Sequence, residues 1–337
     1  MVCTGATVAF ACWLAGCGGG GGGGGVANPG IDASPDSPPP PPWWQPRGNG
    51  EAKNWDIQLS PAAGAVDVSV QRVMYDLDLW ALVPAATVLD YGDGDPVTVP
   101  KGALPDTIAR LHATTPPTIV ICHVETGALE LNRPDARKFP GYVTPPSAIP
   151  DNPASPAAGS VIGWGLATPN ERRLDVREAS RARWISIMFK RFDLAKQIGC
   201  DGVEPERNQV PLTDNTTGFP ALTAAESYSW YAELAKQGHQ RMLSTGMKNG
   251  LAAGQPDYEA PMFDWLMVER CAEGMECDQA RPFVNMDKPV FEIEYSDTYA
   301  TAAAQTAACT VLQTAQIVEG LVKDVALTKN VRVPCSP

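Results

Sequence analysis

From Trp55 onward the chain repeats one pattern, a short strand-like run followed by a stretch with helical spacing. This alternation is typical of βαβ units, in which helices cover a parallel sheet. Eight units in about 290 residues match the usual size of a (β/α)₈ barrel of the TIM type. We therefore predict this α/β fold for residues 49–337, with strands at Trp55–Leu59, Val73–Asp78, Thr118–Glu125, Arg173–Arg177, Gly202–Glu206, Ser244–Asn249, Phe263–Glu269 and Pro289–Tyr295.

Three helices are clear between and after these strands. Ala182–Ile198 has apolar residues at helical spacing and stops at Gly199. Thr223–Lys236 begins with a threonine and has a glutamate three residues later, which predicts a capping box. Thr301–Val325 is expected to close the chain as one long amphipathic helix. The Pro-rich segment Pro140–Ala158 is expected to be an insertion that lines one rim of the barrel.

The first 48 residues do not have the composition of a folded domain. Residues 6–16 form a short uncharged apolar run that fits the hydrophobic region of a signal peptide. It ends in Leu14-Ala15-Gly16-Cys17, which resembles the bacterial lipobox, so residues 1–17 predict a lipoprotein signal with a lipid on Cys17. Eight glycines and a Pro-rich stretch make residues 18–48 a disordered, flexible tether. We expect an exported, membrane-anchored bacterial lipoprotein that meets the membrane only through its lipid.

The net charge and the cysteine content limit the classes of partner and ligand that this chain is expected to bind. The net charge is −12 and no Lys/Arg cluster is present, which argues against nucleic acid and favours a neutral or polycationic polymer. Three histidines and no Cys-x-x-Cys spacing predict no metal and no cofactor. Cys271 and Cys277 bracket a short loop and are the first expected disulfide, and Cys309 with Cys335 is a plausible second. The remaining two lie in strand-like runs, where buried thiols are an alternative to a disulfide: Cys122 and Cys200.

Most of the predicted strands end in a polar or ionisable side chain, and in a barrel these ends converge on the face that carries the active site. Carboxylates in excess suggest cleavage of a glycosidic bond, in which one carboxyl group gives a proton and a second acts as nucleophile or base. We expect Glu206 as nucleophile or base, Glu269 as proton donor, and Glu204 as a group that orients them. The predicted sugar-binding residues are Asp76, Asp78, His123, Glu125, Trp164, Lys248, Asn249, Glu294 and Tyr295. Lys248 and Asn249 could bond sugar hydroxyls or equally pair with the carboxylates.

Ordered motifs over residues 53–297 resemble glycoside hydrolase family 114. They include Trp55-Asp56-Ile57-Gln58-Leu59, Tyr75-Asp76-Leu77-Asp78, Arg133-Pro134-Asp135, Gly199-Cys200-Asp201-Gly202-Val203-Glu204-Pro205, Lys248-Asn249 and Glu294-Tyr295. The resemblance implies a TIM-type barrel and endo-hydrolysis of α-1,4-linked galactosamine polymers, the polygalactosaminidase activity. It also implies that acids on strands five and seven carry the chemistry. We expect a monomer with a polysaccharide substrate.

The chain departs from the family pattern at two strands. The family usually continues Glu-Pro-Asp-Asn-x-Asp where this chain has Glu204-Pro205-Glu206-Arg207-Asn208-Gln209. On strand three, the family's Tyr and Ser are replaced by His123 and Glu125. Arg207 is expected to lower the pKa of the neighbouring acids. Two hypotheses follow: an active endo-glycosidase with shifted specificity, or a catalytically impaired barrel that serves as a glycan-binding surface lipoprotein.

Overall fold

The computed structural model describes residues 41–335 apart from residues 49, 154, 208–216 and 252–254. The predicted signal peptide 1–17, the lipidation site Cys17 and the tether up to residue 40 lie outside these residues. The described chain forms one compact unit. Within it, no helix is both long and apolar enough to cross a membrane.

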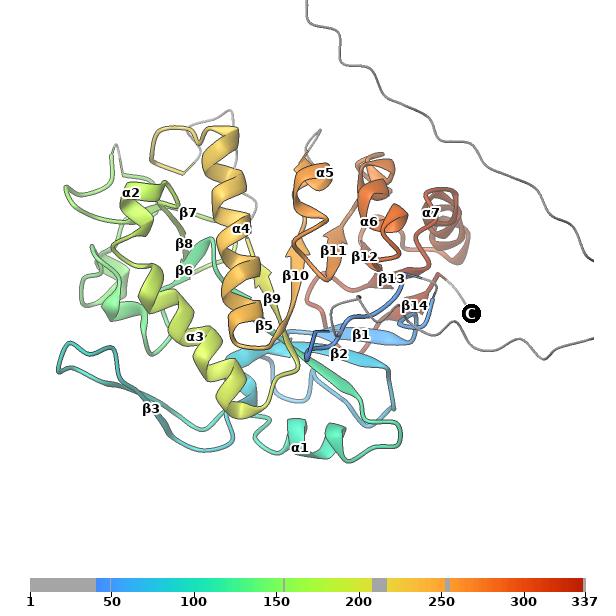
Figure 1. The fold of residues 1–337 in the computed structure, drawn as a ribbon, viewed down its shortest axis with the longest axis horizontal. Helices are drawn as coiled ribbons and strands as arrows, with labels where there is room; N and C mark the ends of the chain where they lie inside the picture. Colours follow the sequence, from blue (N-terminus) through green and yellow to red (C-terminus); the bar gives the residue numbers. More distant parts are fainter. Residues whose placement is uncertain (1–40, 49, 154, 208–216, 252–254, 336–337) are drawn as a thin grey trace, which may run out of the picture. The chain divides into compact units, whose positions relative to one another are not determined.

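Eight parallel strands of the described chain form a barrel, so the predicted TIM-type fold is confirmed (Figure 1). A ninth strand, β14 (Arg332–Pro334), pairs antiparallel with the last of them. The helices on the outside are α1 (Thr107–His112), α2 (Glu178–Arg181), α3 (Ile185–Ile198), α4 (Ala224–Gln240), α5 (Gln255–Glu259), α6 (Arg281–Asn285) and α7 (Ala302–Thr314). In the order in which they neighbour one another, the parallel strands are β1 (Trp55–Gln58), β2 (Met74–Asp78), β5 (Ile119–Glu125), β9 (Gly202–Glu206), β10 (Ser244–Lys248), β11 (Trp265–Glu269), β12 (Val290–Tyr295) and β13 (Glu319–Lys323).

The barrel closes between its first and last strands through side chains. Trp55 on β1 donates from its indole nitrogen to the carbonyl oxygen of Glu319 on β13 at 2.7 Å. The guanidinium of Arg332 on β14 donates to the carbonyl oxygen of Trp55 at 2.7 and 2.9 Å. Lys323 Nζ lies 2.7 Å from Asp56 Oδ1 and is fully buried. Charged and polar side chains therefore bridge the seam between β13 and β1.

Two of the predicted elements were wrong, one a barrel strand and the other the last helix. Residues 173–177 do not form the fourth barrel strand, because β8 (Glu171–Leu174) lies in a separate antiparallel sheet between β6 (Ala128–Glu130) and β7 (Ile162–Gly165). Figure 1 shows these three strands grouped beside α2. The eighth strand of the barrel is β13, which we had placed inside the last helix. That helix, α7, ends at Thr314.

The disulfides reflect the same topology. Cys271–Cys277 and Cys309–Cys335 are bonded as expected. Cys122 and Cys200 also form a disulfide, so buried thiols are the wrong alternative. The reason is that β5 pairs directly with β9, which aligns Cys122 with Val203 and brings Cys200 close. A barrel strand at residues 173–177 would have separated them.

Two apolar layers hold the barrel together. The larger one lies between the strands and the surrounding helices, and the smaller one fills the barrel interior with Trp55, Met74, Trp265, Phe291 and Leu321. Gly246 is required in this interior because a Cβ there would come within 2.0 Å of the Trp265 ring. Side chains two or four residues further along the same strand faces form the site described below.

Residues 41–48, which we assigned to the tether, pack against the barrel. The Trp43 ring stacks on His239 with centroids 4.5 Å apart. Its indole nitrogen and the Gln45 amide each donate to Asp264 Oδ1 at 3.1 Å. Asp264 directly precedes β11, so this segment is fastened at the N-terminal ends of the strands.

Candidate active site

Lys248 is the hub of a charged cluster at the C-terminal ends of β9, β10 and β11. Its Nζ lies 2.7 Å from Glu204 Oε1, 2.7 Å from Glu206 Oε2 and 3.6 Å from Glu269 Oε2. Glu204 and Glu206 are two residues apart on β9, so both side chains point into the barrel. The side chain of Lys248 is only 2% exposed. Of the two roles considered for Lys248, the structure shows pairing with the carboxylates.

Glu204 lies at the base of this cluster and is fully buried. One oxygen contacts Lys248, and the other lies 2.5 Å from His123 Nδ1. Burial raises the pKa of Glu204, but the charges of Lys248 and His123 and its hydrogen bonds to them outweigh this and lower it to about 2. Burial lowers the pKa of His123, whereas the charge of Glu204 raises it to about 10. Glu204 therefore stays ionised, which suits an orienting role and not proton donation.

Asp76 lies deep in the same cluster. It is fully buried, and neither carboxylate oxygen has a hydrogen-bond partner among the described residues. Burial, followed by the negative charge of Glu204, raises the pKa of Asp76 well above its usual range. Asp76 lies beneath the charged residues, and its burial argues against direct contact with a sugar.

Two groups of side chains have the spacing of metal ligands. Asp76, His123 and Glu204 place one potential ligand atom each within 4.8 Å of the others. Lys248 and protonated His123 already compensate the charge of Glu204, so this group does not require a cation. In the second group, Cys271 is joined to Cys277 and offers no thiolate to its neighbours Glu292 and Glu294.

Glu269 is held from two sides at the mouth of the barrel. The Tyr295 hydroxyl donates to Oε1 in a short hydrogen bond, and Asn249 Nδ2 donates to Oε2 at 3.3 Å. Asn249 Oδ1 also accepts the backbone N–H of Glu269 at 2.9 Å. The side chains of Glu269 and Glu206 are 24% and 13% exposed, unlike the buried Glu204. The structure therefore brings the predicted pair together on Lys248, with both acids accessible.

Asp78 and Glu125 lie at strand ends but pair with residues outside the Lys248 cluster. Asp78 Oδ2 is 2.6 Å from Arg133, and its Oδ1 accepts the backbone N–H of Ala81. Glu125 is buried, accepts the backbone N–H of Ala128 at 3.1 Å and lies 3.4 Å from Arg207. Burial, then the charge of Glu206, raises the pKa of Glu125 well above its usual range. These two acids belong to the wall of the mouth.

Two predicted sugar-binding residues are not brought to the cluster. Glu294 is adjacent to Tyr295 on β12 and so points to the opposite face of the strand. There it accepts the backbone N–H of Ala272 at 2.7 Å and is fully buried. Trp164 lies on β7 in the separate sheet, and its indole donates to the carbonyl oxygen of Pro153 at 3.0 Å. Both side chains therefore lie outside the Lys248 cluster, and each is hydrogen-bonded to the backbone of another segment.

Arg207 does not point at the Lys248 cluster. Its Nε lies 3.0 Å from Glu171 Oε2, and Nη2 donates to Thr168 at 3.0 Å. Glu125 is its other acidic neighbour. Burial raises the pKa of both Glu125 and Glu171, and this outweighs the lowering that the charge of Arg207 contributes at each. Glu171 was missed from the sequence because no local pattern marks a contact between residues 36 positions apart.

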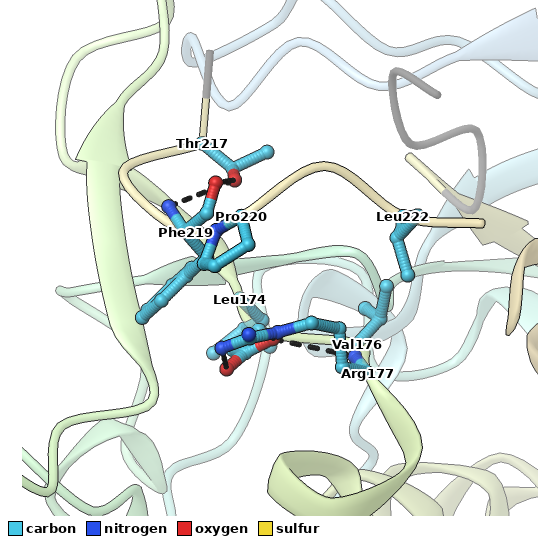
Figure 2. Close-up of a pocket in the computed structure, with 8 residues that line it drawn as sticks. Leu174, Val176, Arg177, Thr217, Phe219, Pro220 and Leu222 are labelled. Atoms are coloured by element: carbon cyan, nitrogen blue, oxygen red, sulfur yellow. Dashed lines mark hydrogen bonds and ion pairs between the residues drawn. The ribbon is translucent and has the colours of Figure 1, made fainter. Parts of the chain in front are cut away.

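A small cavity lies away from these acids. It is lined by Leu174, Asp175, Val176, Arg177, Thr217, Phe219, Pro220 and Leu222. Figure 2 shows Arg177 extended along it, bonded to Asp175 at 2.6 and 2.8 Å. The Arg177 guanidinium also lies 5.7 Å from the centre of the Phe219 ring. Because its charged groups pair with each other, this cavity is a weaker candidate site than the mouth of the barrel.

Comparison with known sequence families decides the assignment. The profile of glycoside-hydrolase family GH114 matches residues 33–336, which is most of the chain. The chain belongs to family GH114. It is a glycoside hydrolase, as the carboxylate-rich mouth predicted. No protein with a curated functional record matches the sequence.

One solved structure is similar to this chain over most of both lengths. Ega3 from Aspergillus fumigatus, solved in complex with galactosamine, is 29% identical with a TM-score of 0.64. The similarity covers 87% of this chain and 97% of Ega3. D-psicose 3-epimerase, solved in the presence of D-fructose, is 7% identical over 81% of this chain and 84% of its own, with a TM-score of 0.39. Sucrose 6F-phosphate phosphorylase from Thermoanaerobacter thermosaccharolyticum is 8% identical over 72% and 59%, with a TM-score of 0.40. The last two likenesses are too weak to support an argument.

Proposed function

We propose that this protein cleaves α-1,4-linked galactosamine polymers at internal bonds, with Glu206 and Glu269 as the two reacting carboxyl groups. The observation that carries the proposal is their meeting at Lys248 while both side chains stay partly exposed. Glu206 replaces an aspartate of the family pattern, and its longer side chain still reaches Lys248 at 2.7 Å. This favours an active enzyme over the impaired, glycan-binding alternative.

The two acids differ in their surroundings. Lys248 is closer to Glu206 than to Glu269, 2.7 Å against 3.6 Å, and this ion pair fixes the position of the Glu206 carboxylate for attack. Glu206 therefore suits the nucleophile or base. Glu269 is the more exposed of the two and is oriented by Tyr295 and Asn249, which suits a donor that must meet the leaving oxygen.

The charge of the mouth supports an amino-sugar substrate. The chain carries a net charge of −12, and Glu204, Glu206 and Glu269 bring three carboxyl groups to the mouth. A deacetylated galactosamine polymer carries positive charge and is attracted to such a site. The galactosamine bound to Ega3, a structure of comparable fold, supports the same substrate class.

The separation of the two acids favours retention of anomeric configuration. Lys248 Nζ lies 2.7 Å from Glu206 Oε2 and 3.6 Å from Glu269 Oε2. The distance between these two carboxylate oxygens therefore cannot exceed the sum of the two distances. That limit is below the roughly 6.5 Å at which inverting enzymes begin. Proton NMR of the first-formed product should show the α-anomer; a β-anomer would contradict retention without affecting the cleavage proposal.

Purified protein incubated with deacetylated and N-acetylated galactosamine polymers tests the activity. We expect shortened oligosaccharides from the deacetylated polymer, and a loss of about 10³-fold in kcat for Glu269→Gln and for Glu206→Gln. Glu178→Gln, the same chemical change on the exposed part of α2, is the matched control. Polymer binding without turnover by the unsubstituted protein would support the binding-module alternative instead.

We further propose that the protein is exported and anchored through Cys17. The lipobox-like Leu14–Cys17 supports this, as do the three disulfides of the described chain, because disulfides persist in oxidising compartments. Metabolic labelling with a radioactive fatty acid should mark the protein, and Cys17→Ala should abolish the label. Labelling that persists in Cys17→Ala would disprove the assignment.

A further inference from the structure

Three neighbouring barrel strands end in the same unusual way. The functional side chains Glu206, Lys248 and Glu269 are the last residues of β9, β10 and β11. Each is followed at once by a non-glycine residue in the left-handed region: Arg207 with φ 53°, Asn249 with φ 51° and Arg270 with φ 60°. The repetition on three consecutive strands of one mouth distinguishes these residues from isolated outliers.

This backbone conformation is unfavourable for residues that carry a Cβ. Glycine adopts it freely, asparagine is tolerated, and arginine has no intrinsic reason to be there. Such conformations persist only where surrounding contacts impose them, and they concentrate at functional sites. The question is therefore what holds these three residues in place.

Each of the three side chains is anchored. Arg207 is fixed by Glu171 at 3.0 Å, with Thr168 and Glu125 beside it. Asn249 exchanges hydrogen bonds with Glu269, donating at 3.3 Å to the carboxylate and accepting its backbone N–H at 2.9 Å.

Arg270 is anchored outside the cluster and acts on it through an aromatic ring. Its guanidinium lies 2.5 Å from Glu273 and 3.1 Å from Asp297. The same group sits 4.6 Å from the centre of the Tyr295 ring, whose hydroxyl bonds Glu269. Arg270 thereby supports one of the two contacts that orient the proposed proton donor.

Backbone hydrogen bonds hold these three strand ends to neighbouring segments. Asn249 N still donates to Met267 O at 2.7 Å, and Arg270 N donates to Ile293 O at 2.9 Å. At β9, the carbonyl oxygen of Glu206 accepts from Thr126 N at 3.0 Å. A Cβ on the adjacent Gly127 would come within 1.7 Å of Arg207 O, so this turn is tightly packed.

We propose that Arg207, Asn249 and Arg270 are positioning residues: anchored left-handed strand ends that aim Glu206, Lys248 and Glu269 at one another. The proposal rests on the proposed function, since it assumes that these three side chains carry the reaction. According to this proposal, the anchoring side-chain contacts fix the direction in which each functional group points, and backbone preference does not.

Glycine substitution separates the two contributions, because glycine accepts the left-handed backbone but removes the anchor. For Arg207→Gly and Arg270→Gly we expect kcat to fall about 10- to 100-fold, as expected for a misplaced reacting group, with KM within about twofold. The melting temperature should not fall in proportion to the loss of kcat, because glycine relieves the backbone strain at these positions. Arg270→Lys, which keeps the charge, should recover part of the lost kcat.

Met242→Gly is the matched control. Met242 also has a left-handed backbone, with φ 56°, but it is 54% exposed and lies before β10, at the opposite end of the barrel. Its glycine variant should keep the kcat of the unsubstituted protein. If Glu269→Gln is inactive while Arg207→Gly and Arg270→Gly keep full kcat, the positioning proposal fails alone. If Glu269→Gln keeps full activity, the proposed function fails with it.

Discussion

The two ends of the barrel use the same kind of pair, a histidine with a carboxylate, for opposite purposes. At the N-terminal end, His112 bonds Asp201 at 2.8 Å, and His239 bonds Asp264 at 2.9 Å. Each aspartate precedes a strand and also accepts a backbone N–H from the neighbouring strand, Val120 N and Thr245 N respectively, at 2.8 Å. These two His–Asp staples therefore join helix, strand and strand.

At the mouth, the third histidine pairs with a side chain that is surrounded by further charges. His123 contacts Glu204, which also contacts Lys248, and Lys248 in turn contacts two more acids. Nearby Asp76 has no hydrogen-bond partner among the described residues. The His–Asp staples accept backbone N–H groups, whereas the mouth has more carboxyl groups than cations. The difference teaches that stability and reactivity are divided between the two ends of this fold.

The largest effect is expected from removing the hub of the mouth. Lys248→Met leaves three carboxylates close together without their common cation, and breaking a buried charge pair costs about 3–5 kcal/mol of unfolding free energy. Urea denaturation should show this loss at pH 7, together with loss of activity. If stability were unchanged, Lys248 would not be the counter-charge of the cluster.

Removing one of the two His–Asp staples should lower the free energy of unfolding and leave kcat unchanged. Asp264→Ala removes the acceptor for Thr245 N and for His239, which should cost about 2–4 kcal/mol of unfolding free energy. The kcat of the folded fraction should stay unchanged. Asp201→Ala tests the other staple in the same way. A drop in kcat without a drop in stability would overturn the division between the two ends.

Glu319 provides a further test of the two ends, because it is a buried acid at the N-terminal end of the barrel with too few hydrogen-bond partners among the described residues. Burial raises its pKa to about 7, although backbone N–H groups oppose this. The unfolded chain loses this proton near its usual pKa of 4.5, so stability falls as pH rises from 4.5 to 7. Glu319→Gln should therefore be more stable than the unsubstituted protein at pH 8 by about 1–3 kcal/mol, and similar to it at pH 4. Thermal unfolding at both pH values measures this; an equal gain at pH 4 would point to packing and not to charge.

The smallest effect is expected where residues 41–48 dock. Trp43→Ala removes the ring stacked on His239 and one hydrogen bond to Asp264, and should cost about 1 kcal/mol of unfolding free energy. Activity should not change, because Trp43 lies at the end of the barrel opposite the mouth. Trp43→Phe, which keeps the ring but not the hydrogen bond, should lose less.

Seven of the eight parallel strands could be predicted from the sequence, because each is an apolar run bounded by a polar end. The eighth could not, since Ile317-Val318 and Leu321-Val322 continue the apolar character of the preceding helix. Residues 173–177 misled the prediction because an antiparallel strand of a small sheet has the same length and flanks as a barrel strand. The Cys122–Cys200 disulfide could be anticipated only with the correct strand order.

The site was predictable wherever the alternation of side chains along a strand was respected. Glu204 and Glu206 share a face, as their spacing indicates. Glu294 and Tyr295 are adjacent and cannot both face the mouth, and only Tyr295 does. Partners distant in sequence, such as Glu171 for Arg207, carry no local mark. The left-handed strand ends were also hidden, because arginine is not a residue that sequence patterns associate with that conformation.

The Cys122–Cys200 disulfide has a practical consequence for an enzyme that would work outside the cell. It joins β5 to the residues just before β9, positions 78 apart in the sequence, and the excursion between them holds the separate three-stranded sheet. A protease that cut this excursion once would leave the two fragments covalently joined, with β5 and β9 still side by side. Damage to the rim would therefore not separate Asp76 and His123 from Glu206, Lys248 and Glu269, which all follow the excursion in sequence.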